Sequence, residues 1–302
     1  MDLAAELARF GPGSGVRAIS SEAARDYCRA LTYSHYENFT VASWLVPRRL
    51  RQHFCNVYAY CRWADDLADE PLVAASPGMR ADELLEWWER QLNELYAGRA
   101  THPVFVALRE TVQIFNLPRE PFADLLAAFR RDQVQTRYET LDELLGYCEK
   151  SANPVGRMVL HLGSSATAEN VELSDAICTG LQLANFCQDV RRDWEIGRIY
   201  LPQELCRQHG WDESRYALGR CDDEFRLLLA ELVAVAEGFF DRGEPLKGTV
   251  SRDLRPAVAV FLGGGRAILA AIRREGYDVW SRRPTVGRLE KAMLLSAAWW
   301  RG

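Results

Sequence analysis

The sequence lacks an excess of basic residues. Its 302 residues include 37 Lys and Arg against 42 Asp and Glu, which gives a formal net charge of −5 at pH 7. A protein that binds nucleic acid regardless of base sequence needs a basic face to displace counterions from the phosphates. We therefore exclude nucleic acid as a partner and expect any anionic ligand to be held by a local group of side chains.

Long hydrophobic runs and an export signal are also lacking. No uninterrupted apolar run reaches the roughly 20 residues that span a bilayer, and the best candidate, residues 257–272, contains Arg266 and three glycines. The first residues have neither the basic start nor the apolar region of a signal peptide. Eight cysteines occur without a C-x-x-C pair, as expected of reduced thiols. We expect a cytoplasmic protein.

The alternation of apolar and polar residues that is typical of β-strands is nearly absent, so the sequence predicts an all-α fold. Residues 1–18 are expected to form a flexible lead, followed by a single all-α domain over residues 19–302. Pro154 lies inside one helical pattern and should bend that helix. Apolar residues recur at helical spacing in segments 21–32, 47–69, 80–97, 103–116, 120–136, 141–162, 172–194, 222–242, 252–275 and 285–300.

Two of these segments carry acidic stripes. In "YCRWADDLADE" (residues 60–70), Arg62, Asp65 and Asp69 share one helix face. In "GLQLANFCQDVRRDW" (residues 180–194), Gln182, Asn185, Asp189 and Asp193 follow one another at spacings of three, four and four. Each stripe could be an ordinary solvated face. Amides within so apolar a segment, and like charges four residues apart, favour a binding role instead.

A hard cation would remove the repulsion within each stripe. Mg²⁺ takes oxygen ligands and is commonly shared between carboxylates and substrate phosphates. The two stripes therefore predict a diphosphate held through Mg²⁺, with Arg62 able to contact phosphate oxygens. Arg191 and Arg192 could do the same or could form surface ion pairs with nearby acids. Aspartate-rich helices in an aromatic-rich, all-α protein fit ionisation of an allylic diphosphate to a carbocation in an apolar tunnel.

At these residues the chain resembles the squalene/phytoene synthase family. The resemblance covers about residues 25–295 and rests on "VYAYCRWADDLAD", "LLGYCEKSANPVGRMVL", "GLQLANFCQDVRRDWEIGRIYLP" and "EGYDVWSRRPTV". It implies a class I terpenoid synthase helical bundle with a central apolar cavity. It further implies a prenyl diphosphate substrate and Mg²⁺.

The resemblance also implies roles for individual residues. Metal binding and catalysis would involve Asp65, Asp69, Asp189 and Asp193, with Tyr147 near the cation. The remaining assignments concern substrate contacts, and for the C-terminal segment they favour Arg283 over its neighbour Arg282. The implied substrate-binding residues are Phe39, Arg62, Gln182, Asn185, Gln188, Tyr200 and Arg283.

Two departures from phytoene-type members resemble the bacterial hydroxysqualene synthase subgroup of hopanoid pathways. Gln188 stands where those members usually have Arg, and "HYENFTVASWLVP" replaces a Ser-rich stretch. That subgroup ionises presqualene diphosphate, rearranges the cation and captures water, so we expect no NADPH. The alternatives are condensation of two farnesyl diphosphates to presqualene diphosphate or squalene, a phytoene-type synthase, and a catalytically inactive helical scaffold.

Other motifs receive structural interpretations. "GGGR" at 263–266 lacks the spacing of a phosphate-binding loop and indicates close helix packing. Trp87–Trp88 and Trp299–Trp300 are expected to bury against the core, although a peripheral membrane contact stays open because the product is greasy. A handoff of substrate from a presqualene diphosphate synthase, and of product to a hydroxysqualene-processing enzyme, also stays open.

Overall fold

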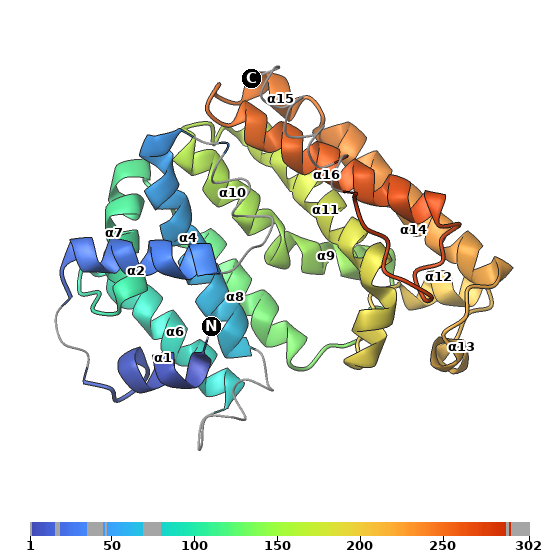
Figure 1. Cartoon of the computed structure of the whole chain (residues 1–302), viewed down its shortest axis with the longest axis horizontal. Coiled ribbons are helices and arrows are strands. Elements are labelled where there is room, and N and C mark those ends of the chain that lie inside the picture. Colours follow the sequence, from blue (N-terminus) through green and yellow to red (C-terminus); the bar gives the residue numbers. More distant parts are fainter. Residues whose placement is uncertain are drawn as a thin grey trace. The chain divides into compact units, whose positions relative to one another are not determined.

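A computed structural model of the chain describes residues 2–15, 19–34, 45, 47–68, 80–287 and 290, and Figure 1 shows it as a ribbon. The all-α prediction is confirmed, because this part of the chain contains helices and no strand. An isolated parallel bridge joins Arg137 and Ile199. The helices are α1 (Leu3–Phe10), α2 (Ser21–Ser34), α4 (Arg48–Ala68), α6 (Ala81–Tyr96), α7 (Pro103–Phe115), α8 (Glu120–Asp132), α9 (Leu141–Ser151), α10 (Asn153–Leu162), α11 (Ala168–Glu195), α12 (Gln203–Gln208), α13 (Glu213–Leu218), α14 (Asp223–Gly243), α15 (Leu246–Thr249) and α16 (Arg255–Arg274).

The bend predicted at Pro154 is a break between two helices. The helix expected over residues 141–162 ends as α9 at Ser151 and restarts as α10 at Asn153. Proline lacks the backbone donor of a helix interior but fits a first turn, which is where Pro154 lies. Most of the predicted segment 285–300 falls outside the described residues.

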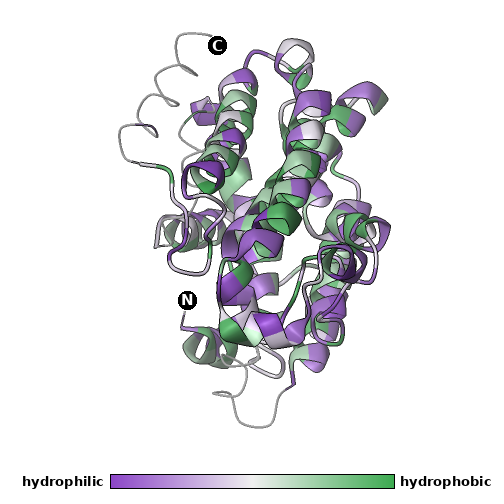
Figure 2. Cartoon of the chain, turned by 90° about the vertical axis from the view of Figure 1, so that its right-hand side faces the viewer, coloured by the Kyte–Doolittle hydropathy of each residue, from purple (hydrophilic) through white to green (hydrophobic). Residues whose placement is uncertain are grey.

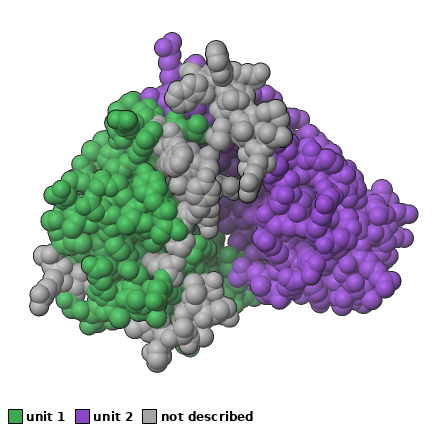
Figure 3. All heavy atoms as spheres, viewed as in Figure 1, with its two compact units in different colours: residues 1–134, 158–165 green, residues 135–157, 166–302 purple. Residues whose placement is uncertain are grey.

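Contacts divide the chain into two compact units, coloured separately in Figure 3. Unit 1 comprises residues 1–134 and 158–165, and unit 2 comprises residues 135–157 and 166–302. In unit 1, α4 packs against α2, α6, α7 and α8, which makes it the central helix of this unit. The expectation of one domain over residues 19–302 stays a prediction.

Residues 3–10 form a helix where we expected part of a flexible lead. The Asp2 side chain caps α1, and Leu3, Leu7 and Phe10 are buried. The Tyr27 hydroxyl on α2 donates a 2.6 Å hydrogen bond to Glu6. An eight-residue amphipathic helix is too short to be stable alone, so α1 depends on this tertiary packing, which a periodicity analysis does not include.

An aromatic cluster in unit 1 encloses His102. Its ring lies edge-on to Trp63 and Trp88, with centroids 4.8 and 4.9 Å away, and only 1% of the residue is exposed. The expected burial of Trp87–Trp88 is confirmed. Nδ1 of His102 accepts a hydrogen bond from the backbone amide of Val104 and so caps α7. Burial lowers the pKa of His102 to about 3.

This buried imidazole predicts a pH-dependent stability. In the unfolded chain His102 titrates near its ordinary pKa of about 6.5, whereas in the folded protein it stays neutral to about pH 3. Below pH 6.5 only the unfolded state binds the proton, so the free energy of unfolding should fall by about 2 kcal/mol between pH 7 and pH 5. Urea unfolding at both pH values measures this change. His102→Asn keeps a side-chain acceptor for the cap but has no imidazole to titrate, so this fall in the free energy of unfolding should disappear. Equal pH dependence in both proteins would contradict the assignment.

In unit 2, α11 packs against α14 and α16. Hydrophobic and hydrophilic residues both occur along the helices drawn in Figure 2, as helical periodicity predicts. A Cβ on Gly265 would lie 2.3 Å from the ring of Phe240, so close packing explains this glycine of "GGGR", whereas a Cβ on Gly264 would meet no atom within 4 Å. Within the described residues, α16 is long and apolar enough to span a membrane by length and composition, but 44% of the relevant window is buried inside the protein. We interpret α16 as a core helix.

Candidate active site

The first acidic stripe lies at the end of α4, in unit 1. Nη1 of Arg62 is 3.6 Å from Oδ2 of Asp65, as their shared helix face predicts. Nη2 of Arg62 is 2.5 Å from Oδ1 of Asp66, whose side chain is 1% exposed against 59% for Asp65. The two neighbouring aspartates therefore differ in role. Asp66 anchors Arg62 from inside, and Asp65 presents its carboxylate to solvent.

The second stripe lies near the end of α11, in unit 2. Nδ2 of Asn185 donates a 2.6 Å hydrogen bond to Oδ2 of Asp189, one turn further along the helix. The guanidinium of Arg283 forms an ion pair with Asp189, and its Nη2 lies 2.8 Å from Oδ2. Arg283 comes from the segment after α16, so the fold brings together two stretches that are 94 residues apart in sequence.

Asp189 and Asp193 have opposite pKa shifts. Burial alone would raise the pKa of Asp189, but the hydrogen bonds and charge of Arg283 bring it below its ordinary value. Burial, followed by the negative charge of Asp189, raises the pKa of Asp193 to about 7. A carboxyl group with such a pKa is poised to lose its proton when a cation arrives.

Aromatic rings gather beside this stripe. Phe186 on α11 stacks on Tyr200 with centroids 4.0 Å apart and ring planes within 11°. Tyr147 on α9 lies 5.9 Å from Tyr200, and Tyr138 lies 5.3 Å from Tyr147. All four rings are buried. Their electron-rich faces could stabilise a positive charge that forms next to the carboxylates.

A tight turn after α11 places Tyr200 in this cluster. Gly197 has φ +80°, which glycine adopts without strain, and its amide donates to the carbonyl of Trp194. The chain then reverses, and the amide of Ile199 donates a 2.9 Å hydrogen bond to the carbonyl of Thr136. The "GRIY" sequence thus returns its tyrosine to the side of α11 that carries Phe186.

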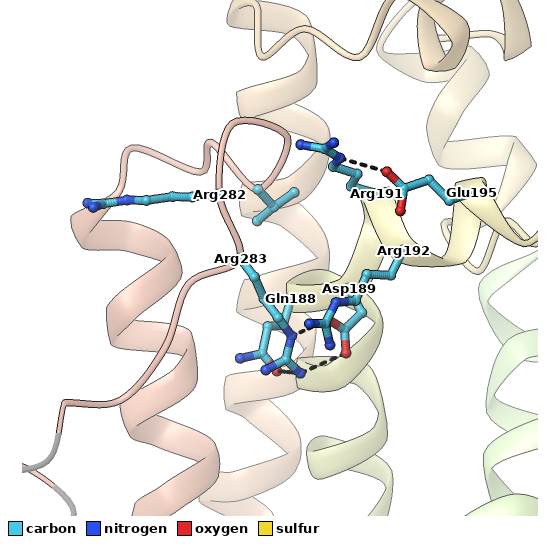
Figure 4. A pocket seen from close by; sticks show the side chains of 8 residues that line it. Gln188, Asp189, Arg191, Arg192, Glu195, Arg282 and Arg283 are labelled. Carbon is cyan, nitrogen blue, oxygen red and sulfur yellow. Dashed lines mark hydrogen bonds and ion pairs between the residues drawn. The ribbon is translucent and has the colours of Figure 1, made fainter.

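A pocket of about 220 Å³ opens next to Asp189. Figure 4 shows that side chains from the end of α11 and from the C-terminal segment surround it. Arg191 forms an ion pair with Glu195, and Arg192 forms one with Asp189, as predicted by the alternative that these arginines pair with nearby acids. Both arginines also line the pocket. The charged lining consists of four arginines and two acids: Arg191, Arg192, Arg282, Arg283, Asp189 and Glu195. This excess of positive charge suits a phosphate group.

The oxygen donors of the second stripe are of the type that Mg²⁺ prefers. Asp189, Asp193 and Asn185 offer carboxylate and amide oxygens, and the guanidinium of Arg283 shows that the site accepts a cationic group against Asp189. Within the described residues, which leave out Asp69, no three His, Cys, Asp or Glu side chains gather closely enough to hold a metal ion.

Comparison with known sequences decides the family. A sequence model described as "Squalene/phytoene synthase" matches residues 32–290. The chain belongs to the squalene/phytoene synthase family. It is 33% identical over 294 residues to 15-cis-phytoene synthase of Synechocystis sp., covering 93% of this chain and 86% of that protein. It is 33% identical over 286 residues to phytoene synthase of Arthrospira platensis, covering 90% and 91%.

Solved structures of this family share the fold. Squalene synthase HpnC from Alicyclobacillus acidocaldarius is 43% identical, with a TM-score of 0.81 over 87% of this chain and 98% of that chain. A dehydrosqualene synthase in complex with ligand is 28% identical, with a TM-score of 0.82 over 92% and 96%. This chain is therefore an enzyme of the head-to-head isoprenoid synthase family, and its prenyl diphosphate chemistry follows from membership.

The structure brings together several of the residues that the sequence indicated. Within unit 2, Asp189 contacts Asn185 and Arg283, and Tyr147 joins Tyr200. Gln182 is half-buried one turn before Asn185. Arg282 forms an ion pair with Glu275, whereas the neighbouring Arg283 is the arginine that pairs with Asp189. Two predicted residues, Asp69 and Phe39, lie outside the described residues.

Sequence reasoning missed three contributors. Asp66 was not singled out from Asp65, although an acid four residues after Arg62 is a recognisable helical pair. Phe186 and Tyr138 had no signal of their own, because aromatic residues in apolar segments usually serve the core. Their significance comes from their contacts with Tyr200 and Tyr147.

Proposed function

We propose that this family member converts presqualene diphosphate and water to hydroxysqualene and diphosphate in a magnesium-dependent reaction in the cytoplasm. The observation that carries the proposal is the arrangement around α11, where a carboxylate stripe lies between an arginine-lined pocket and a buried aromatic cluster. Such a site suits a substrate with an anionic head that leaves and a greasy body that becomes positively charged. The 43% identity to a solved squalene synthase supports the squalene branch.

The resemblance to this family assigns metal binding to the aspartates of each stripe, Asp65 and Asp69 in the first and Asp189 and Asp193 in the second. Bound magnesium supplies positive charge that makes diphosphate a better leaving group. Arg62 and Arg283 donate to phosphate oxygens. As the carbon–oxygen bond breaks, both electrons leave with the diphosphate and a cyclopropylcarbinyl cation remains on the substrate.

The aromatic cluster stabilises the cation. Tyr147 presents a ring face that stabilises positive charge during the rearrangement, Tyr200 sits beside the phosphates, and Gln182 and Asn185 border the ionising centre. One water then adds its oxygen to the rearranged cation and releases a proton. No hydride is consumed in this sequence, and we therefore expect no requirement for NADPH.

The second candidate is condensation of two prenyl diphosphates, because both of the curated relatives above are named phytoene synthases. The two functions are distinguished by which diphosphate the enzyme turns over. With presqualene diphosphate, Mg²⁺ and no NADPH, we expect hydroxysqualene and stoichiometric diphosphate, measured by mass spectrometry and phosphate assay. Farnesyl or geranylgeranyl diphosphate alone should not turn over. Turnover of either compound alone, or squalene that appears only with NADPH, would refute the proposal.

A further inference from the structure

The segment after α16 is attached to α11 beside the acidic stripe. We call residues 278–287 the C-terminal strap. Val279 and Trp280 are buried, and Trp280 packs edge-on against Tyr216. The carbonyl of Trp280 accepts a 3.1 Å hydrogen bond from Nη1 of Arg191 on α11. These contacts anchor the first part of the strap. They do not determine the position of the later strap residues.

The side-chain amide of Gln188 forms hydrogen bonds to the next part of the strap through both its nitrogen and its oxygen. Nε2 donates a 2.6 Å hydrogen bond to the carbonyl of Pro284, and Oε1 accepts a 2.8 Å hydrogen bond from Nη2 of Arg283. Gln188 is 6% exposed, so its amide bonds in an environment where such hydrogen bonds are strong. In Figure 4 the guanidinium of Arg283 lies against both Gln188 and Asp189.

Among common side chains, a neutral amide suits this position. An arginine at 188 could donate to Pro284 but could not accept from Arg283, and it would bring a second positive charge against that guanidinium. A methionine of similar length would form neither hydrogen bond. The Gln188 amide thus holds Arg283 beside Asp189 without adding charge to a pocket that already has four arginines.

We propose that Gln188 is a positioning residue that holds the Arg283 guanidinium where it can bind the single diphosphate of the substrate. Gln188 acts on the substrate through Arg283 rather than by its own contact. The inference deepens the proposed function and rests on it for the identity of the anion. It also makes position 188 a determinant of how many positive charges face the diphosphate.

Hydrogen exchange in the metal-free, full-length protein tests the contact without any substrate. Gln188→Arg and Gln188→Met should each raise amide exchange in residues 281–287 by about fivefold, because the strap loses its attachment there. Gln113→Arg makes the same chemical change at an exposed position on α7 and should leave the strap unchanged. Wild-type exchange of this segment in both Gln188 variants would overturn the proposal.

A double-mutant cycle tests whether Gln188 acts through Arg283. The probe is inorganic pyrophosphate with Mg²⁺, titrated by calorimetry. We expect Gln188→Met and Arg283→Ala each to weaken binding about tenfold, and the double variant to bind no more weakly than Arg283→Ala alone. Additive losses would contradict a positioning role. Wild-type protein that fails to bind the probe would refute the proposed function, whereas hydrogen exchange would still decide whether Gln188 holds the strap.

Discussion

Asp189→Asn should lower the rate of diphosphate release from presqualene diphosphate by about a thousandfold, because it removes a charge that both the metal and Arg283 require. Asparagine keeps the shape of aspartate and an oxygen that can accept from Asn185. The fold should therefore survive, and the loss should appear in turnover. Initial rates of diphosphate release under saturating Mg²⁺ measure the effect.

The matched control for this substitution is Asp223→Asn. Asp223 begins α14, its side chain is 91% exposed, and its described contact is an ion pair with Arg226. The same loss of charge at this surface position should leave turnover within twofold of wild type, since exposed pairs contribute at most about 1 kcal/mol to stability. If Asp189→Asn were as active as Asp223→Asn, the second stripe would have no part in ionisation.

Asp66→Ala should destabilise the protein by about 3 kcal/mol, because it removes the close partner of a largely buried guanidinium. Arg62 is 18% exposed and Asp66 is 1% exposed, so little solvent is available to replace the lost carboxylate. Urea unfolding, with circular dichroism at fixed pH, gives the difference in the free energy of unfolding.

Asp65→Ala is the matched comparison on the same helix. Asp65 faces the same arginine at 3.6 Å, but its side chain is 59% exposed, and its removal should change stability by less than about 1 kcal/mol. Comparing the free energies of unfolding of the two variants therefore distinguishes the structural role of Asp66 from the binding role proposed for Asp65. Equal destabilisation by both would show that Asp66 does not anchor Arg62 from the interior.

Long helices could be predicted closely from the sequence. The segment expected at 103–116 is α7 over Pro103–Phe115, and the one expected at 222–242 is α14 over Asp223–Gly243. These helices repeat their apolar stripe over several turns, so local periodicity carries the information. Short helices such as α12 and α13 have six residues each. Fewer than two turns give no periodic signal, and such helices depend on caps and tertiary contacts.

The same distinction applies to the site. Spacing along one helix indicated that Asn185 and Asp189 would be neighbours, because residues four apart share a helix face. The contact between Asp189 and Arg283 could not be derived from spacing, since 94 residues separate them; the choice of Arg283 came from resemblance. Neither route revealed that Gln188 binds the backbone of Pro284, because a side-chain to backbone hydrogen bond leaves no pattern in the partner's sequence.

Product analysis after reaction in ¹⁸O-labelled water shows whether solvent water captures the cation. The protein would be incubated with presqualene diphosphate and Mg²⁺, without NADPH, and the lipid product examined by mass spectrometry. The proposed mechanism predicts hydroxysqualene that carries one ¹⁸O atom, because solvent water captures the cation after diphosphate has left. A product without the label, or intact presqualene diphosphate, would contradict it.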